Sequence, residues 1–138
     1  MKPSLFLICS IFFVSNVFSQ KNEGPPYIKS IFFGGGDYYI DNRQKQELND
    51  FLDGIDGLEQ YQIIVTSHTD TIGSLEYNQR LSQMRSMSTI RLLELRGIPE
   101  AVIQRKDYGE LNPDFDNRTW EGKLRNRRAD VILIPPDS

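Results

Sequence analysis

Apolar residues along the chain recur with two different periods, which predict strands alternating with helices. Short apolar or β-branched runs predict strands over residues 28–33, 61–65, 102–108 and 129–134, the last as a fully apolar run. Apolar residues spaced by three or four positions predict a helix between Asp41 and Gly57, and a short helix covers residues 119–125. This alternation predicts one α/β domain with helices on one face of a small sheet.

The longest predicted helix has the clearest periodicity. Gly73 or Ser74 is placed to cap its start and Gly97 to end it. Asn78 and Arg85 are seven residues apart, or two helical turns, so they share one face. The residues expected to form its buried face fall at steps of three or four; they are Tyr77, Leu81, Met84, Ser88, Leu92 and Leu95.

The first residues have the features of an export signal. Lys2 precedes an apolar stretch from Leu5 to Phe18, and the small residue Ser19 follows it. This stretch is shorter than the roughly 20 residues that a membrane-spanning helix needs. Cys9 lacks the preceding small residue of a lipoprotein signal, so no lipid anchor is expected.

These features predict the domain organisation. A signal peptide covers residues 1–19, a linker 20–26, the domain 27–135 and a tail 136–138. Once residues 1–19 are removed no cysteine remains, which excludes disulfides and thiol catalysis. The sequence has 16 basic against 19 acidic side chains, and 15 basic side chains without Lys2, so nucleic acid is not an expected partner.

No set of residues predicts catalysis, a cofactor or a metal site. Ser67, His68 and Asp70 have the residue types of a hydrolase triad, but they crowd into four positions, whereas triad members converge from separate parts of a fold. His68 is the only histidine, so carboxylates alone would have to complete a zinc site. The glycines at 34–36 lack the Gly-Lys-Ser/Thr of a phosphate-binding loop.

Asp70 and Arg85 suggest a different chemistry. Asp70 lies in the loop that leads into the helix carrying Arg85, so a carboxylate can face a guanidinium. Such a pair matches a zwitterionic amino-acid group, because the carboxylate takes the ammonium and the guanidinium binds the carboxylate through two hydrogen bonds. An ordinary Asp70–Arg85 salt bridge, or Asp70 capping the helix, satisfies the same spacing.

Three motifs in register resemble the OmpA-like peptidoglycan-binding domain of Gram-negative envelope proteins. They are HTDTIGSLEYNQRLSQMR from His68, YGELNP from Tyr108 and NRTWEGKLRNRR from Asn117. The resemblance covers about residues 28–134. It implies a two-layer α/β sandwich with a mixed parallel and antiparallel sheet, no catalytic activity, and a ligand, the diaminopimelate side chain of the peptidoglycan stem peptide.

The resemblance also implies site residues. Asp70 matches the aspartate of the His-Thr-Asp motif and Arg85 the arginine that closes Leu-Ser-x-x-Arg, the two main ligand contacts of the family, which favours the clamp over the simple salt bridge. Asn78 matches a secondary polar contact. Arg127 reaches the same groove, or it forms a solvated or strand-positioning pair with Arg128.

The remaining conspicuous residues have plainer interpretations. His68 is expected to be a hydrogen-bonded structural residue, and Trp120 to be a packing residue. Gly34, Gly35 and Gly36 stand where family members commonly carry Asp-aromatic-Asp, so side chains that would line the groove are absent. Basic residues near the C-terminus are expected to form a solvated face; they are Arg118, Lys123, Arg125, Arg127 and Arg128.

The sequence therefore predicts an exported, non-enzymatic module that binds peptidoglycan non-covalently. It is expected to stand alone in the periplasm, or at the outer membrane, of a Gram-negative-type envelope. The alternative is a periplasmic protein-interaction or scaffold module that has lost or altered wall binding, with other envelope proteins as its partners. The oligomeric state stays open.

Overall fold

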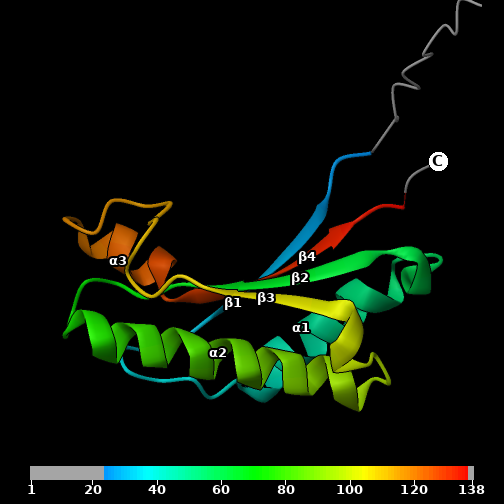
Figure 1. Cartoon of the computed structure of the whole chain (residues 1–138), viewed down its shortest axis with the longest axis horizontal. Helices are drawn as coiled ribbons and strands as arrows, with labels where there is room; N and C mark the ends of the chain where they lie inside the picture. The colour runs from blue at the N-terminus through cyan, green and yellow to red at the C-terminus, as the bar shows by residue number, and fades with distance from the viewer. Residues whose placement is uncertain (1–23, 137–138) are drawn as a thin grey trace, which may run out of the picture.

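The computed structural model describes residues 24–136, so the expected signal peptide, most of the linker and the last two residues lie outside the described part of the chain (Figure 1). The strands are β1 (Tyr27–Phe32), β2 (Gln62–Ser67), β3 (Ile103–Asp107) and β4 (Arg128–Ile134). The helices are α1 (Asn42–Asp53), α2 (Leu75–Leu95) and α3 (Trp120–Asn126), with single 3-10 turns η1 (Leu58–Gln60) and η2 (Glu100–Val102). The kinds and order of the predicted strands and helices are confirmed.

The four strands form one mixed sheet in the order β1-β4-β2-β3. β4 is antiparallel to both β1 and β2, and β3 is parallel to β2. Helices α1 and α2 cover one face, while α3 lies at the end of the sheet where β4 begins (Figure 1). The expected two-layer mixed sandwich is confirmed. Within residues 24–136, no helix has the length and apolar character needed to cross a membrane.

The apolar core lies between the sheet and helices α1 and α2. Alternate residues of each strand point into it because side chains on a strand alternate between faces. Among its fully buried members are Ile31, Leu48, Leu52, Val65, Leu93, Val131 and Leu133. The start of α1 is fixed to β1, since Gln44 accepts a hydrogen bond from the Phe32 amide at 2.7 Å and donates one to its carbonyl at 2.9 Å.

The predicted buried face of α2 is confirmed only in part, since Leu81 is buried and Leu92 packs against the core. Tyr77, Met84 and Leu95 are 42%, 39% and 70% exposed. The face that packs on the sheet is largely polar; its buried residues are Asn78, Leu81, Ser82, Arg85, Ser86, Thr89, Ile90 and Leu93. Ser82 and Ser86 form hydrogen bonds at the strand ends. The helix therefore turns these polar residues toward the sheet and leaves several of its apolar side chains exposed.

The serines of α2 show how this polar contact is satisfied. Ser86 Oγ lies 2.8 Å from Ser67 Oγ and donates to the Asp107 carboxylate at 2.5 Å. Ser82 Oγ accepts a hydrogen bond from the Gly109 amide at 3.0 Å. These bonds tie the helix to the ends of β2 and β3.

The last strand is not fully apolar. Asp130 lies in its interior, only 7% exposed, and accepts hydrogen bonds from Ser30 Oγ at 2.6 Å and Arg128 Nε at 3.0 Å. Val131 and Leu133 point into the core, so Asp130 points to the face that α1 and α2 leave uncovered. A buried carboxylate is tolerated there because it is both paired and hydrogen-bonded.

Candidate functional site

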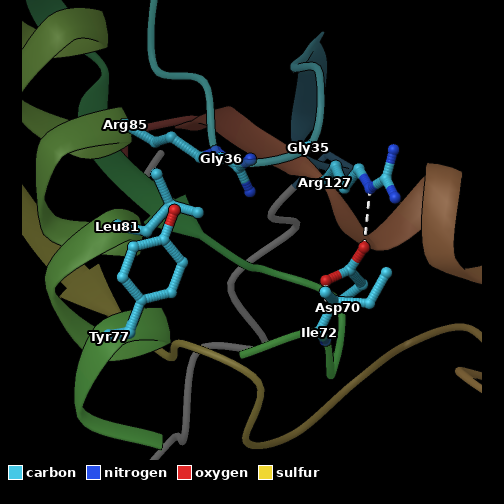
Figure 2. A pocket seen from close by; sticks show the side chains of 8 residues that line it. All are labelled: Gly35, Gly36, Asp70, Ile72, Tyr77, Leu81, Arg85 and Arg127. Atoms are coloured by element: carbon cyan, nitrogen blue, oxygen red, sulfur yellow. Dashed lines mark hydrogen bonds and ion pairs between the residues drawn. The ribbon is translucent and has the colours of Figure 1, made fainter. Parts of the chain in front are cut away.

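A pocket of about 340 Å3 lies where β2 ends and α2 begins (Figure 2). It is lined by Gly35, Gly36, Asp70, Ile72, Tyr77, Leu81, Arg85 and Arg127. Three of the predicted ligand-binding residues, Asp70, Arg85 and Arg127, therefore meet in one cavity. The fourth, Asn78, does not line it.

The loop after β2 is shaped by its own hydrogen bonds. The Thr69 amide donates to the Gly109 carbonyl at 2.8 Å, and the Ile72 amide donates to Asp70 Oδ1 at 3.0 Å. Ser74 is the cap of α2, because its side chain accepts a hydrogen bond from the Tyr77 amide. The Asp70 carboxylate is thereby held near the N-terminus of α2 and points toward the pocket (Figure 2).

Asp70 pairs with Arg127 and not with Arg85. Arg127 Nε lies 2.7 Å from Asp70 Oδ2, and the two side chains are 9% and 8% exposed. The simple Asp70–Arg85 salt bridge, one alternative of the sequence analysis, is wrong, because Arg127 enters the pocket from the junction of α3 and β4. The solvated-pair interpretation of Arg127 and Arg128 is also wrong, since these residues are 7% and 5% exposed.

Arg85 is fully buried and joins separate segments of the chain. Its Nε donates to the Asp37 carbonyl, Nη1 to the His68 carbonyl and Nη2 to the Gly34 carbonyl, each at 2.9 Å. Burial lowers the pKa of Arg85 to about 10, while the nearby Asp70 charge acts in the opposite direction. Arg85 is still protonated at neutral pH, and it places a positive charge in the wall of the pocket.

Arg127 differs from Arg85 in its unused donors. Its Nε is bonded to Asp70, whereas its Nη1 and Nη2 make no hydrogen bond to any residue between 24 and 136. The guanidinium lies over the Trp120 ring, 4.9 Å from the ring centroid. Trp120 is 62% exposed, so its expected role as a packing residue is wrong.

Asn78 is fully buried beside the pocket. Its Nδ2 donates to Glu110 Oε2 at 2.5 Å, and its Oδ1 has no partner in the described part of the chain. The side chain holds the loop that follows β3 against α2. A ligand contact by Asn78 stays a prediction.

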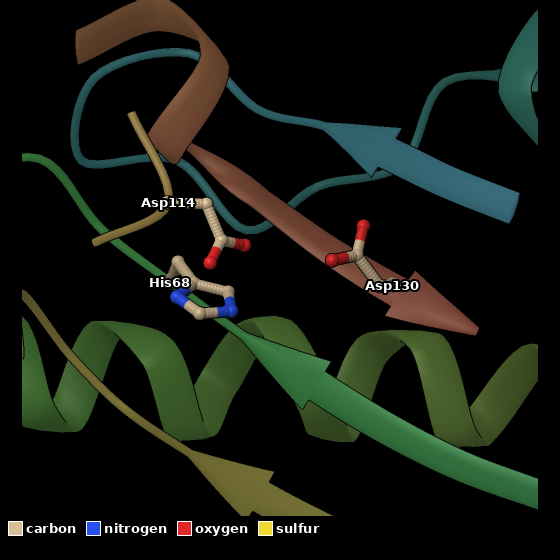
Figure 3. Close-up of side chains that lie close together, drawn as sticks. All are labelled: His68, Asp114 and Asp130. Carbon is tan, nitrogen blue, oxygen red and sulfur yellow. The ribbon is translucent and has the colours of Figure 1, made fainter. Parts of the chain in front are cut away.

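His68 lies in a second group of polar side chains, on the uncovered face of the sheet (Figure 3). Ligand atoms of His68, Asp114 and Asp130 lie within 4.8 Å of one another, an arrangement that the sequence analysis did not expect. Arg128 already binds both carboxylates, at Asp114 Oδ2 and Asp130 Oδ2, and so supplies the positive charge that a cation would bring. We therefore interpret the group as an ion-pair network.

The expected hydrogen bond of His68 is not found. Its Nδ1 is buried without a partner among the described residues, and its ring stacks on Tyr108 with centroids 5.1 Å apart. Burial, and after it the charge of Arg128, lower the pKa of His68 from its ordinary value of 6.5. His68 is thus held neutral, as a structural residue at the end of β2.

Comparison with known proteins identifies the family of this chain. Residues 32–127 match the model of the OmpA family. The chain belongs to the OmpA family. Outer membrane protein A of Bordetella avium is 39% identical over 72 residues, which make up 52% of this chain and 37% of that protein. The outer-membrane lipoprotein YfiB of Pseudomonas aeruginosa is 27% identical over 122 residues, 87% of this chain and 72% of that protein.

A solved structure extends the OmpA-family likeness to three dimensions. The peptidoglycan-associated lipoprotein of Burkholderia pseudomallei aligns with a TM-score of 0.69 and 26% identity, covering 76% of this chain and 89% of that one. The chain spans 37% of Bordetella avium outer membrane protein A and 32% of the Escherichia coli lipoprotein YiaD. The similarity therefore describes the OmpA-like domain and not the whole of those relatives.

Sequence reasoning missed two parts of this OmpA-family site. Trp120 was not connected with Arg127, although the two are seven residues apart on one short helix and its end, a spacing that places them on the same side. The backbone carbonyls that receive Arg85 could not be found, because any residue type supplies a carbonyl. The helical spacing could therefore have indicated the first contact, whereas no sequence signal marks the second.

Proposed function

We propose that this OmpA-family domain binds peptidoglycan non-covalently through the amino-acid head group of diaminopimelate in the stem peptide. The observation that carries the proposal is that a buried carboxylate, Asp70, and a guanidinium with unused donors, Arg127, meet in one pocket with Arg85 in its wall. One structural neighbour is named as a peptidoglycan-associated lipoprotein.

The charges of the pocket match a zwitterion. The Asp70 oxygens each accept one hydrogen bond, from Ile72 N and Arg127 Nε, so each keeps capacity for a ligand ammonium. A ligand carboxylate is attracted by the guanidinium groups of Arg127 and Arg85. Charge-assisted hydrogen bonds of this kind contribute about 1.5 to 3 kcal/mol each.

We assign the pocket a binding role without catalysis. Its lining residues hold no nucleophile paired with a general base; Tyr77 supplies the single hydroxyl among them. The relatives named above are outer-membrane proteins and lipoproteins. We therefore place the protein in the cell envelope, exported to the periplasm or to the periplasmic side of the outer membrane, with the cell wall as its partner.

Sedimentation with purified sacculi that contain diaminopimelate tests this function. We expect the wild-type chain to sediment with the sacculi and Asp70→Asn to stay in solution, because the amide cannot hold an ammonium as a carboxylate does. Asp56→Asn is the matched control, since Asp56 is exposed in the loop after α1. Thermal melts of each variant confirm folding. Equal sedimentation of Asp70→Asn and wild type would contradict the proposed site.

A protein-interaction role is the second candidate, favoured by one feature of the sheet. Ile28, Ile132 and Ile64 are paired across β1, β4 and β2, on the face that α1 and α2 leave uncovered. Ile28 is 55% exposed. Copurification of an envelope protein with the wild-type chain, together with no binding to sacculi, would favour this role over wall binding.

A further inference from the structure

The two arginines of the pocket are not equally available to a ligand. Each guanidinium nitrogen of Arg85 already donates to a backbone carbonyl, and the side chain is fully buried. Arg127 uses only Nε, and its two Nη atoms have no partner among residues 24–136. A carboxylate can therefore form paired hydrogen bonds with Arg127 without breaking an existing contact.

The guanidinium of Arg127 has two close neighbours, Trp120 and Gly35. The Trp120 ring centroid lies 4.9 Å from its Cζ. A Cβ atom added at Gly35 would lie 3.5 Å from Cζ and 3.6 Å from each Nη, so the glycine backbone lies beside the same group. A Trp ring is the most favourable aromatic surface for a cation, and a planar guanidinium stacks on it well. Both neighbours limit the movement of the guanidinium, and neither forms a hydrogen bond with its Nη atoms.

The position of Trp120 is itself well determined. Thr119 caps α3 by accepting a hydrogen bond from the Gly122 amide at 3.0 Å. Gly122 packs so closely that an added Cβ would lie 2.0 Å from the Asp116 carbonyl oxygen. These contacts fix the first turn of α3 against the loop that precedes it. Trp120 is the first residue of this helix.

We propose that Trp120 is a positioning residue of the pocket, which together with the Gly35 backbone holds Arg127 so that its two free Nη groups bind the carboxylate of the ligand. This inference rests on the proposed function and narrows its ligand class. The site takes an amino-acid head group whose carboxylate is free, because a carboxamide offers one oxygen to two donors and turns its own NH2 group toward them. Gly35 gains a role, since a long side chain at this position would press against the guanidinium.

Calorimetric titration with two synthetic tripeptides tests the proposal. Both are L-Ala-γ-D-Glu-diaminopimelate; one has free diaminopimelate carboxylates, and in the other the carboxylate of the head group is a carboxamide. We expect wild type to bind the carboxylate peptide about tenfold or more tighter than the carboxamide. Arg127→Lys keeps the charge but loses the paired donors, so this preference should shrink.

Variants of Trp120 separate positioning from packing. Trp120→Leu keeps apolar volume and is expected to bind the carboxylate peptide about five- to tenfold more weakly, while Trp120→Phe keeps an aromatic face and most of the affinity. Leu124→Ala is the matched control on the same helix, because Leu124 is 42% exposed and should not alter binding. A merely structural role would be served equally by leucine and phenylalanine.

The outcomes distinguish this inference from the proposed function. If wild type binds both peptides equally, or if Trp120→Leu binds as wild type does, the positioning role is overturned while wall binding stands. If wild type binds neither peptide nor sacculi, the proposed function fails and the inference fails with it. Carboxylate preference in wild type that is lost in Trp120→Leu and kept in Trp120→Phe supports the proposal.

Discussion

Arg85 provides a direct test of how this domain is held together. Methionine at this position keeps much of the length of the side chain but removes every donor. The carbonyl oxygens of Gly34, Asp37 and His68 would then lose the hydrogen bonds that they accept from Arg85 at 2.9 Å. Two of these carbonyls belong to the loop after β1 and one to the end of β2, so the change should loosen the whole end of the sheet that carries the pocket.

The expected loss follows from two opposing contributions. A buried acceptor left without its partner costs about 1 to 3 kcal/mol, and neighbouring losses do not add fully. Removal of the guanidinium also removes the cost of burying its charge, which is the cost that lowers the pKa of Arg85 to about 10. We therefore expect Arg85→Met to lower the free energy of unfolding by about 3 kcal/mol, a large part of the ~5 to 15 kcal/mol typical of a domain.

Urea unfolding followed by far-ultraviolet circular dichroism measures this loss. Arg80→Met is the matched control, because Arg80 lies on the same helix, is 62% exposed in its side chain and, among the described residues, pairs only with Glu76 one turn earlier. That variant should stay within about 0.5 kcal/mol of wild type. An equally small change for Arg85→Met would refute the conclusion that Arg85 joins these segments.

Three further predictions concern other parts of the structure. The lowered pKa of His68 makes the folded protein bind a proton less readily than the unfolded chain. The urea concentration at the unfolding midpoint should therefore decrease when the pH is lowered from about 7.5 to about 5.5, and this decrease should be smaller in His68→Gln. Gly122→Ala should lower the melting temperature, because its Cβ would meet the Asp116 carbonyl oxygen at 2.0 Å, and an unchanged melt would contradict that packing. Ser86→Ala should cost about 1 to 2 kcal/mol in urea unfolding through its lost bond to Asp107, and a neutral effect would argue against this network.

Much of the fold could be predicted because its determinants are local. Strand and helix periods, the Asp41 and Ser74 caps and the glycines after the elements all lie within a few residues of what they specify. The buried face of α2 could not be predicted in this way. Its polar contacts include a hydrogen bond that Ser86 donates to Asp107 and one that Ser82 accepts from the Gly109 amide, and the hydrophobicity pattern of the helix does not indicate either bond.

In the candidate site, likewise, the residues could be predicted from the sequence but their pairing could not. Motif resemblance selected Asp70, Arg85 and Arg127 from the sequence, and the fold brings all three to one pocket. Their pairing was beyond sequence reasoning, because two arginines carry the same charge and only three-dimensional position decides which one meets Asp70. Trp120 was missed for a related reason. Whether a residue at the end of a helix is exposed depends on how that helix packs against the rest of the fold.

The sequence by itself determined the order of strands and helices, the family and the residue types available for an amino-acid ligand, since these depend on short-range pattern and composition. Only the tertiary structure decided which charges are paired and which donors remain free. The physical reason is that ion pairing and burial depend on distances between segments far apart in the chain. Asp70 and Arg127 are 57 residues apart, yet their side chains meet at 2.7 Å.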